Sequence, residues 1–156
     1  MVSFAQLWQP SSMADAEPPL TDLISAAATA ATSARARAYA PYSKFTMGAA
    51  AVSVEGDVVE GVLVENVSLG LAMCAERVAL FAAVTRGIRP VVLAVCSKRT
   101  GGELTLPCGA CLQVALEVAG SELTVVAVDP DGEVEHASLG SLLPRAPSRH
   151  SPDFDE

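Results

Sequence analysis

The sequence predicts an α/β protein: a three-layer αβα sandwich in which helices cover a mixed sheet of about five strands. Two observations carry this prediction. Apolar residues recur at helical spacing in three segments, and the segments between them include Val-rich runs with the composition of strands. The segments follow one another in the order α-β-β-α-β-α-β-β, without an internal repeat. The 156 residues, 51% of them hydrophobic, suffice for one domain with a substantial core.

The expected elements follow from periodicity and from the positions of Gly and Pro. We expect helices at 20–38, 74–86 and 109–119, strands at 47–54, 58–64, 91–97, 123–128 and 133–136, and a helical turn at 139–143. Thr21 or Asp22 is available to cap the first helix. The first two strands form a hairpin, because Gly56 in their short connection can adopt a positive φ. The apolar side of the second helix is expected to consist of Val78, Leu80, Phe81 and Val84.

The predicted domain spans residues 20–147. Residues 1–19 are rich in Pro, Ser and Gln and have no periodicity, so we expect a mobile N-terminal extension, with Met13 as a second candidate start. Residues 148–156 contain Pro and acidic residues and are expected to form a loose acidic tail.

The composition argues against polynucleotide and membrane partners. The 18 acidic and 10 basic residues give a net charge of -8, which repels phosphate backbones, and the aromatic fraction of 4% leaves few surfaces for base stacking. No segment approaches the roughly 20 apolar residues of a membrane span, and the first residues lack the pattern of a secretory signal. We therefore expect a cytoplasmic protein that binds neither nucleic acid polymers nor membranes.

A split group of three cysteines and one acid is the main functional signal. Cys74 is followed two residues later by Glu76, and Cys108 and Cys111 form a Cys-x-x-Cys pair downstream. Three thiolates can fill three corners of a tetrahedral Zn²⁺ site and leave the fourth position open for water. A carboxylate beside the first ligand can then move protons. The pattern predicts a hydrolytic enzyme with one Zn²⁺ per chain.

The same residues allow other interpretations. The Cys-x-x-Cys pair alone fits a redox pair or half of a structural zinc ribbon, and Glu76 alone fits a solvated helix residue. A structural zinc site needs a fourth protein ligand, however. Cys96 lies in an apolar run typical of a core strand, and His136 and His150 lie near or in the C-terminal segment. The sequence therefore favours a catalytic over a structural zinc site.

Both halves of the predicted metal site fall at helix starts. A helix N-terminus presents free backbone N–H groups and a partial positive charge, which favour the thiolate form that binds zinc. Three thiolates leave the metal centre with a net charge of about -1, which weakens its pull on water. We expect the helix ends and Arg77, which follows Glu76, to offset this charge from outside the ligand set.

Four blocks of the sequence occur in a specific order. They are 39–45 (YAPYSKF), 64–68 (VENVS), 74–77 (CAER) and 107–111 (PCGAC). Together they resemble the small homotetrameric cytidine deaminases and the related blasticidin-S deaminases, and the similarity covers about residues 20–147. The resemblance implies the cytidine deaminase-like fold and a homotetramer in which neighbouring subunits help to complete each active site.

The resemblance also implies a reaction: hydrolytic deamination of a free cytosine nucleoside, cytidine or deoxycytidine, as in pyrimidine salvage. Glu76 would take a proton from the attacking water and pass protons to N3 and to the leaving amine. The backbone N–H of Ala75 would meet the base carbonyl, Phe45 would lie against the ring, and Glu65 would hold a ribose hydroxyl. On the residues alone, Phe45 could equally pack in the core, and Glu65 could be an exposed acid at the end of a strand.

Some positions depart from the family pattern. Leu63 replaces an Asn and offers no hydrogen bond, Leu69 stands where Tyr is usual, and Leu112 and Pro147 replace an Arg and a Phe. A lost hydrogen bond costs about 1–3 kcal/mol, so we expect a remodelled sugar pocket that admits cytosine nucleoside analogues. One alternative is a nucleoside-antibiotic deaminase of the blasticidin-S type. Another, from a different class, is a zinc-stabilised binding or assembly module without turnover.

Overall fold

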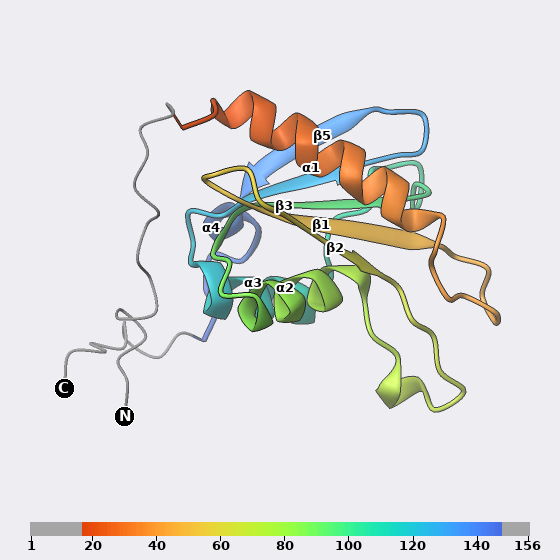
Figure 1. The fold of residues 1–156 in the computed structure, drawn as a ribbon. Helices are drawn as coiled ribbons and strands as arrows, with labels where there is room; N and C mark the ends of the chain where they lie inside the picture. The colour runs from red at the N-terminus through yellow and green to blue at the C-terminus, as the bar shows by residue number, and fades with distance from the viewer. Residues whose placement is uncertain (1–16, 148–156) are drawn as a thin grey trace.

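A five-stranded mixed sheet with helices on both faces forms the centre of the molecule (Figure 1). The computed structural model describes residues 17–147. In chain order the elements are α1 (Leu20–Arg35), β1 (Met47–Ser53), β2 (Val58–Val62), η2 (Leu69–Leu71), α2 (Ala75–Thr85), β3 (Pro90–Ser97), α3 (Gly109–Ala119), β4 (Thr124–Val128), β5 (Val134–Ser138) and α4 (Leu139–Leu142). The α/β class and the expected order of elements are confirmed.

The strands lie in the order β2-β1-β3-β4-β5. β3 and β4 are parallel, with α3 in the connection between them, whereas the other neighbouring pairs are antiparallel. β1 and β2 form the expected hairpin, and Gly56 in their connection has a φ of 89°. Glycine adopts this left-handed value without the steric cost that a Cβ would bring. β3 occupies the middle of the sheet, and residues 92–97 are buried.

Each face of the sheet has its own hydrophobic core. α1 covers one face, where Leu23, Ala27 and Ala31 pack on residues of β1, β3 and β4. α2, α3 and α4 cover the other face, with Leu80 and Leu139 among the fully buried side chains. Because successive residues of a strand point to opposite faces, the same strands supply both cores. The predicted three-layer αβα sandwich is thereby confirmed.

Two glycines of the hairpin let helices approach the sheet at backbone distance. A Cβ atom on Gly48 would lie 2.3 Å from the carbonyl oxygen of Ala31 in α1. A Cβ atom on Gly61 would lie 2.3 Å from the carbonyl oxygen of Ala75 in α2. These two helices cover opposite faces of the sheet. Gly61 therefore sets how closely the first turn of α2 packs on β2.

The boundaries of α1 differ from the expected ones. The helix ends at Arg35, because the amides of Arg37 and Ala38 donate to carbonyls three residues back, at 2.9 and 3.2 Å. Such bonds tighten the chain into a turn. Pro19 is the N-cap residue and makes no side-chain capping bond, so the expectation of a cap at residue 21 or 22 was wrong.

The apolar side expected for α2 is only partly buried. Leu80 is fully buried, but Phe81 and Val84 are 46% and 48% exposed. At Gly61 the helix backbone packs directly on the strand, and the residues of α2 that lie there, Ala75 and Ala79, are small. Phe81 and Val84 lie on the outer side of the helix.

The expected N-terminal extension and acidic tail lie largely outside the described residues, which begin at residue 17 and end at residue 147. Their mobility remains an expectation. Within residues 17–147, no helix has both the length and the apolar character needed to cross a bilayer.

Gly61→Ala is expected to destabilise the fold and to weaken metal binding. The new methyl group must displace the Ala75 carbonyl, and overpacking of this kind costs about 1–3 kcal/mol of unfolding free energy. Ala75 follows a predicted zinc ligand, so zinc affinity should fall too. Gly48→Ala is the matched control, since its clash is equally close but involves α1. Urea denaturation and competitive zinc titration provide the measurements; an equal loss of zinc affinity in both variants would contradict the prediction.

Candidate metal and catalytic site

The three predicted zinc ligands come together at the starts of two helices. Cys74 is the N-cap residue of α2, and Cys108 is the N-cap residue of α3. Cys111 lies in the first turn of α3. Since α2 and α3 pack together on one face of the sheet, the two half-sites meet. The expected placement of the thiols at helix N-termini is confirmed.

The thiol cluster fits a zinc ion. The three Sγ atoms all lie within 4.8 Å of one another, and those of Cys108 and Cys111 are 3.4 Å apart. Tetrahedral thiolates at a Zn–S distance of 2.3 Å are about 3.8 Å apart, so little movement is needed. Cys111 is buried, Cys74 is intermediate and Cys108 is exposed, which leaves the cluster open to solvent on one side. The protein thus offers one Zn²⁺ site per chain.

Within residues 17–147, no fourth protein ligand joins this cluster. Cys96 is fully buried in β3 and belongs to the core under α1, on the opposite face of the sheet. His136 is exposed on β5, and His150 lies outside the described residues. A site with three protein ligands is typical of catalytic rather than structural zinc.

Arg77 lies beside the first ligand. Its Nη2 donates a hydrogen bond to the Sγ of Cys74 at 3.6 Å. A hydrogen bond from Cys111, together with Arg77, lowers the pKa of Cys74 to about 5, whereas the bond to Cys74 raises the pKa of Cys111. Cys74 is therefore the first of these two thiols to ionise, and its charge is balanced by the guanidinium.

Glu76 is buried next to the thiols. Glu76 is only 1% exposed, and its Oε2 has no hydrogen-bond partner within the described residues. Burial raises the pKa of Glu76 to about 7. A carboxyl group that gains and loses its proton near neutral pH is suited to general acid–base catalysis. The interpretation of Glu76 as an ordinary solvated helix residue does not fit this burial.

A short backbone network joins the loop at 39–45 to the segment that precedes Cys74. The amide of Tyr39 donates to the Leu63 carbonyl at 2.9 Å, and the amide of Glu65 donates back to the Tyr39 carbonyl at 2.8 Å. Val64 pairs on its other side with Met73 through bonds of 3.0 and 2.9 Å. Segments that are distant in sequence are thus held in fixed positions relative to the metal ligands.

The residues singled out for substrate binding lie in different settings. Phe45, Leu63 and Glu65 are half-buried in or beside this network. Ala75 is fully buried at the first position of α2, where a backbone N–H has no acceptor within the helix. Leu69 is separate from them, 86% exposed on the projecting loop that contains η2 (Figure 1).

The carboxylate of Glu65 is held by the loop at 39–45. It accepts hydrogen bonds from the amide of Tyr42 at 2.8 Å, from the amide of Ser43 at 3.3 Å and from the Ser43 hydroxyl. These bonds, the Ser43 hydroxyl first, lower the pKa of Glu65. No local sequence pattern predicts a role for Ser43, because residues 43 and 65 are distant in the sequence and meet only in the fold.

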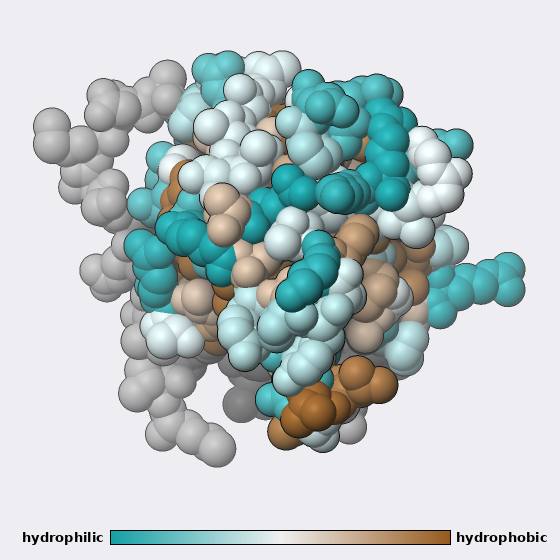
Figure 2. Space-filling model, turned by 90° about the vertical axis from the view of Figure 1, so that its right-hand side faces the viewer, coloured by the Kyte–Doolittle hydropathy of each residue, from teal (hydrophilic) through white to brown (hydrophobic). Residues whose placement is uncertain are grey.

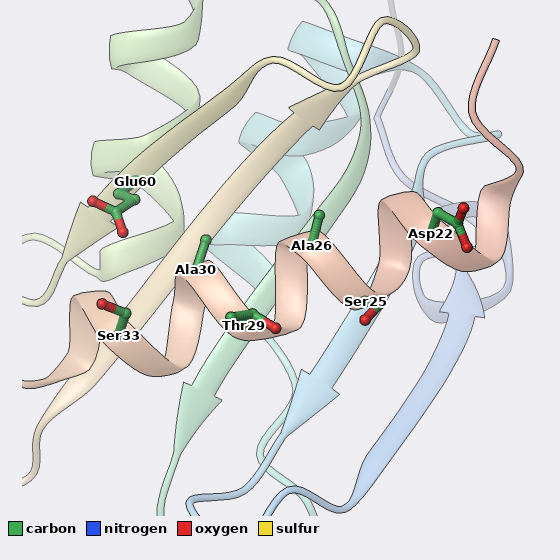
Figure 3. Close-up of a pocket in the computed structure, with 7 residues that line it drawn as sticks. All are labelled: Asp22, Ser25, Ala26, Thr29, Ala30, Ser33 and Glu60. Atoms are coloured by element: carbon green, nitrogen blue, oxygen red, sulfur yellow. The ribbon is translucent and has the colours of Figure 1, made fainter. Parts of the chain in front are cut away.

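A shallow groove runs along α1, on the face of the sheet opposite the metal cluster. Its lining carries two carboxylates and three hydroxyls but no thiol. The lining residues are Asp22, Ser25, Ala26, Thr29, Ala30, Ser33 and Glu60 (Figure 3). Since α1 covers the face opposite α2 and α3, this groove is separate from the metal cluster.

The fold and the three-thiol site with its buried acid define a zinc-dependent hydrolase. A family model, described as the cytidine and deoxycytidylate deaminase zinc-binding region, matches residues 22–127. The chain therefore belongs to the cytidine and deoxycytidylate deaminase family and is a zinc-dependent aminohydrolase.

Individual relatives agree with this membership. A cytidine deaminase of Halalkalibacterium halodurans is 41% identical over 113 residues, which cover 72% of this chain and 85% of that protein. A cytidine deaminase of Mycobacterium tuberculosis is 46% identical over 116 residues, covering 74% of this chain and 83% of that protein. The crystal structure of cytidine deaminase from Burkholderia pseudomallei matches with a TM-score of 0.71 at 45% identity, covering 83% of this chain and 99% of the other.

Cys111→Ala is expected to abolish stoichiometric zinc binding, whereas Cys96→Ala should retain it. Removing one of three thiolates should lower the bound metal from about one ion per chain to less than about 0.2 after dialysis against a weak chelator. Cys96 is a matched control, because it is an equally buried cysteine on the opposite face of the sheet. Elemental analysis of both purified variants gives the answer, and zinc loss in Cys96→Ala alone would be incompatible with the assigned ligands.

Proposed function

We propose that the protein deaminates free cytidine and deoxycytidine hydrolytically to uridine or deoxyuridine and ammonia. The observation that carries this proposal is the buried carboxyl of Glu76 beside a cluster of three thiols, with an Oε2 that has no hydrogen-bond partner among residues 17–147. The relatives described above are themselves named cytidine deaminases. The nucleoside-antibiotic alternative and the module without turnover are not favoured by these relatives.

The residues can be given separate tasks in this reaction. Cys74, Cys108 and Cys111 would hold Zn²⁺, which when bound supplies a Lewis acid that makes water nucleophilic at neutral pH. As water attacks C4 of the cytosine ring, Glu76 takes one proton from it and delivers this proton to N3. Glu76 then takes the remaining proton of the added hydroxyl group and delivers it to the amine, so that the C4–N bond breaks, the C4 carbonyl forms and ammonia leaves. Its raised pKa, about 7, allows both the protonated and the ionised form to be populated at neutral pH. Arg77 offsets the charge of the thiolates.

The substrate is held by groups around this centre. The free backbone N–H of Ala75 at the start of α2 donates to the carbonyl oxygen of the base. Phe45 packs against the ring, and Glu65 accepts a hydrogen bond from a ribose hydroxyl. Leu63, half-buried between these segments, offers the sugar only apolar contact. The net charge of -8 favours a free nucleoside over a polynucleotide.

We also propose that the enzyme is a cytoplasmic homotetramer with shared active sites. Val67, Leu69 and Leu71 are 81%, 86% and 68% exposed on the projecting loop, and Figure 2 shows hydrophobic residues gathered at the lower end of that side of the molecule. Apolar surface of this kind supports contact with another subunit, to which Leu69 would contribute. All four cysteines are free thiols, which suits a reducing compartment.

Glu76→Gln is expected to abolish turnover while the metal stays bound. Gln is close to Glu in shape but cannot exchange a proton, so kcat for cytidine should fall at least about 10³-fold. Zinc content should remain near one ion per chain, because Glu76 is not a ligand. Ammonia release and elemental analysis test the two halves of this prediction. A variant that still releases ammonia at the wild-type rate would remove Glu76 from the mechanism.

Leu63→Asn is expected to improve the use of sugar hydroxyls. The amide adds hydrogen-bonding groups where Leu has none, so kcat/KM for cytidine should rise roughly tenfold. The control substrate is 2′,3′-dideoxycytidine, which lacks the hydroxyls that the amide would bind and should show little change. Steady-state kinetics with cytidine and with 2′,3′-dideoxycytidine provide the measurement. An equal change in kcat/KM for the two substrates would refute the idea of a remodelled sugar pocket.

A further inference from the structure

We propose that Ser43 is a positioning residue whose hydroxyl links the Glu65 carboxylate to the Phe45 backbone and thereby fixes two nucleoside contacts relative to each other. This inference rests on the proposed function, since the contacts matter only if a nucleoside binds there. Ser43 itself need not touch the substrate. Its effect is exerted through the residues on either side of the bridge.

The bridge is made by a single oxygen atom. Ser43 Oγ donates a hydrogen bond to Glu65 Oε1 and accepts one from the Phe45 amide at 3.0 Å. The amides of Tyr42 and Ser43 donate to the same carboxylate at 2.8 and 3.3 Å. An ionised carboxylate accepts such bonds best, and the lowered pKa of Glu65 agrees with this arrangement. The position of Glu65 is therefore coupled to the path of the loop.

Backbone strain within the bridge indicates why it is needed. Lys44, between Ser43 and Phe45, has a φ of 60°, and it is the one non-glycine with a positive φ in residues 17–147. Such a conformation persists only where the surroundings hold it. The Lys44 side chain donates to the Pro41 carbonyl at 2.6 Å, and its amide donates to the Ala40 carbonyl at 3.2 Å. The Ser43 hydroxyl completes the restraint, since it spans Lys44 and ties the turn to another segment.

Backbone hydrogen bonds connect the bridged turn to the segment that precedes the metal site. The Glu65 amide donates a hydrogen bond to the Tyr39 carbonyl, and Val64 pairs with Met73, the residue before Cys74. Within residues 17–147, no side chain of the bridge belongs to the thiol cluster. Loss of the Ser43 hydroxyl should therefore disturb substrate binding and leave proton transfer and zinc binding intact. A residue with a merely structural role would instead lower stability without separating KM from kcat.

Three variants of the zinc-loaded enzyme test the proposal: Ser43→Ala, Ser43→Thr and, as a control, Ser33→Ala. Removing a hydrogen bond to a charged group should raise KM for cytidine about tenfold, while kcat changes less than about twofold. Thr retains the hydroxyl and should restore KM to within about threefold of the wild-type value. Ser33, exposed on the outer side of α1, is the control and should leave both constants unchanged. Unchanged KM in Ser43→Ala, or a fall in kcat alone, overturns the proposal.

Hydrogen exchange at the Phe45 amide tests the Ser43 bridge without any substrate. This amide donates to Ser43 Oγ, so its exchange should accelerate at least about tenfold in Ser43→Ala, while amides of β1 stay protected. Unchanged exchange at Phe45 shows that the bridge does not form and overturns the proposal. A wild-type enzyme that does not turn over cytidine refutes the proposed function instead, and the exchange experiment then decides separately whether Ser43 holds the turn.

Discussion

The site depends on the direct contact between β2 and the first turn of α2. At Gly61 the strand has no side chain, and the helix backbone takes the space that a Cβ atom would need, 2.3 Å from the Ala75 carbonyl oxygen. The sheet thereby sets the position of the residues on either side of Ala75, which are the first thiol and the buried acid. α3 packs on α2 and brings the Cys-x-x-Cys pair to them. A small residue in a strand thus governs a metal site that it does not touch.

Cys74 and Glu76 are two residues apart, but the surroundings of Cys74 favour its anion and those of Glu76 favour its neutral form. Cys74 receives hydrogen bonds from Cys111 and, to a smaller extent, from Arg77, which stabilise its anion and lower its pKa to about 5. Glu76 loses contact with water, and burial stabilises its neutral form and raises its pKa to about 7. Helix geometry separates the two side chains, because residues two apart point in different directions. One short segment can therefore supply both a metal ligand and a carrier of protons.

Local patterns in the sequence predicted much of this arrangement. The bounds of α3 agree with the expected ones, because Pro107 and Gly120 flank a strongly helical run, and the Cys spacing predicted a ligand set that the fold brings together. The exposure of Phe81 was missed, since the approach of α2 to Gly61 is a contact between distant segments. The Ser43–Glu65 bond was missed for the same reason. Helical periodicity shows which side chains share a face of a helix. It does not show which face packs on the sheet, because that depends on a glycine elsewhere in the sequence.

The thiol cluster has a consequence for the choice of metal. The three Sγ atoms lie within 4.8 Å of one another, close to the spacing of tetrahedral thiolates around a single ion. Three sulfur ligands in a tetrahedral arrangement suit several thiophilic divalent ions, and selectivity among such ions depends on geometry, ligand type and metal availability. The supply of each metal in the cell then contributes to which ion is bound. A tetrahedral sulfur site also accepts cobalt, which would serve as an optical reporter of ligand exchange here.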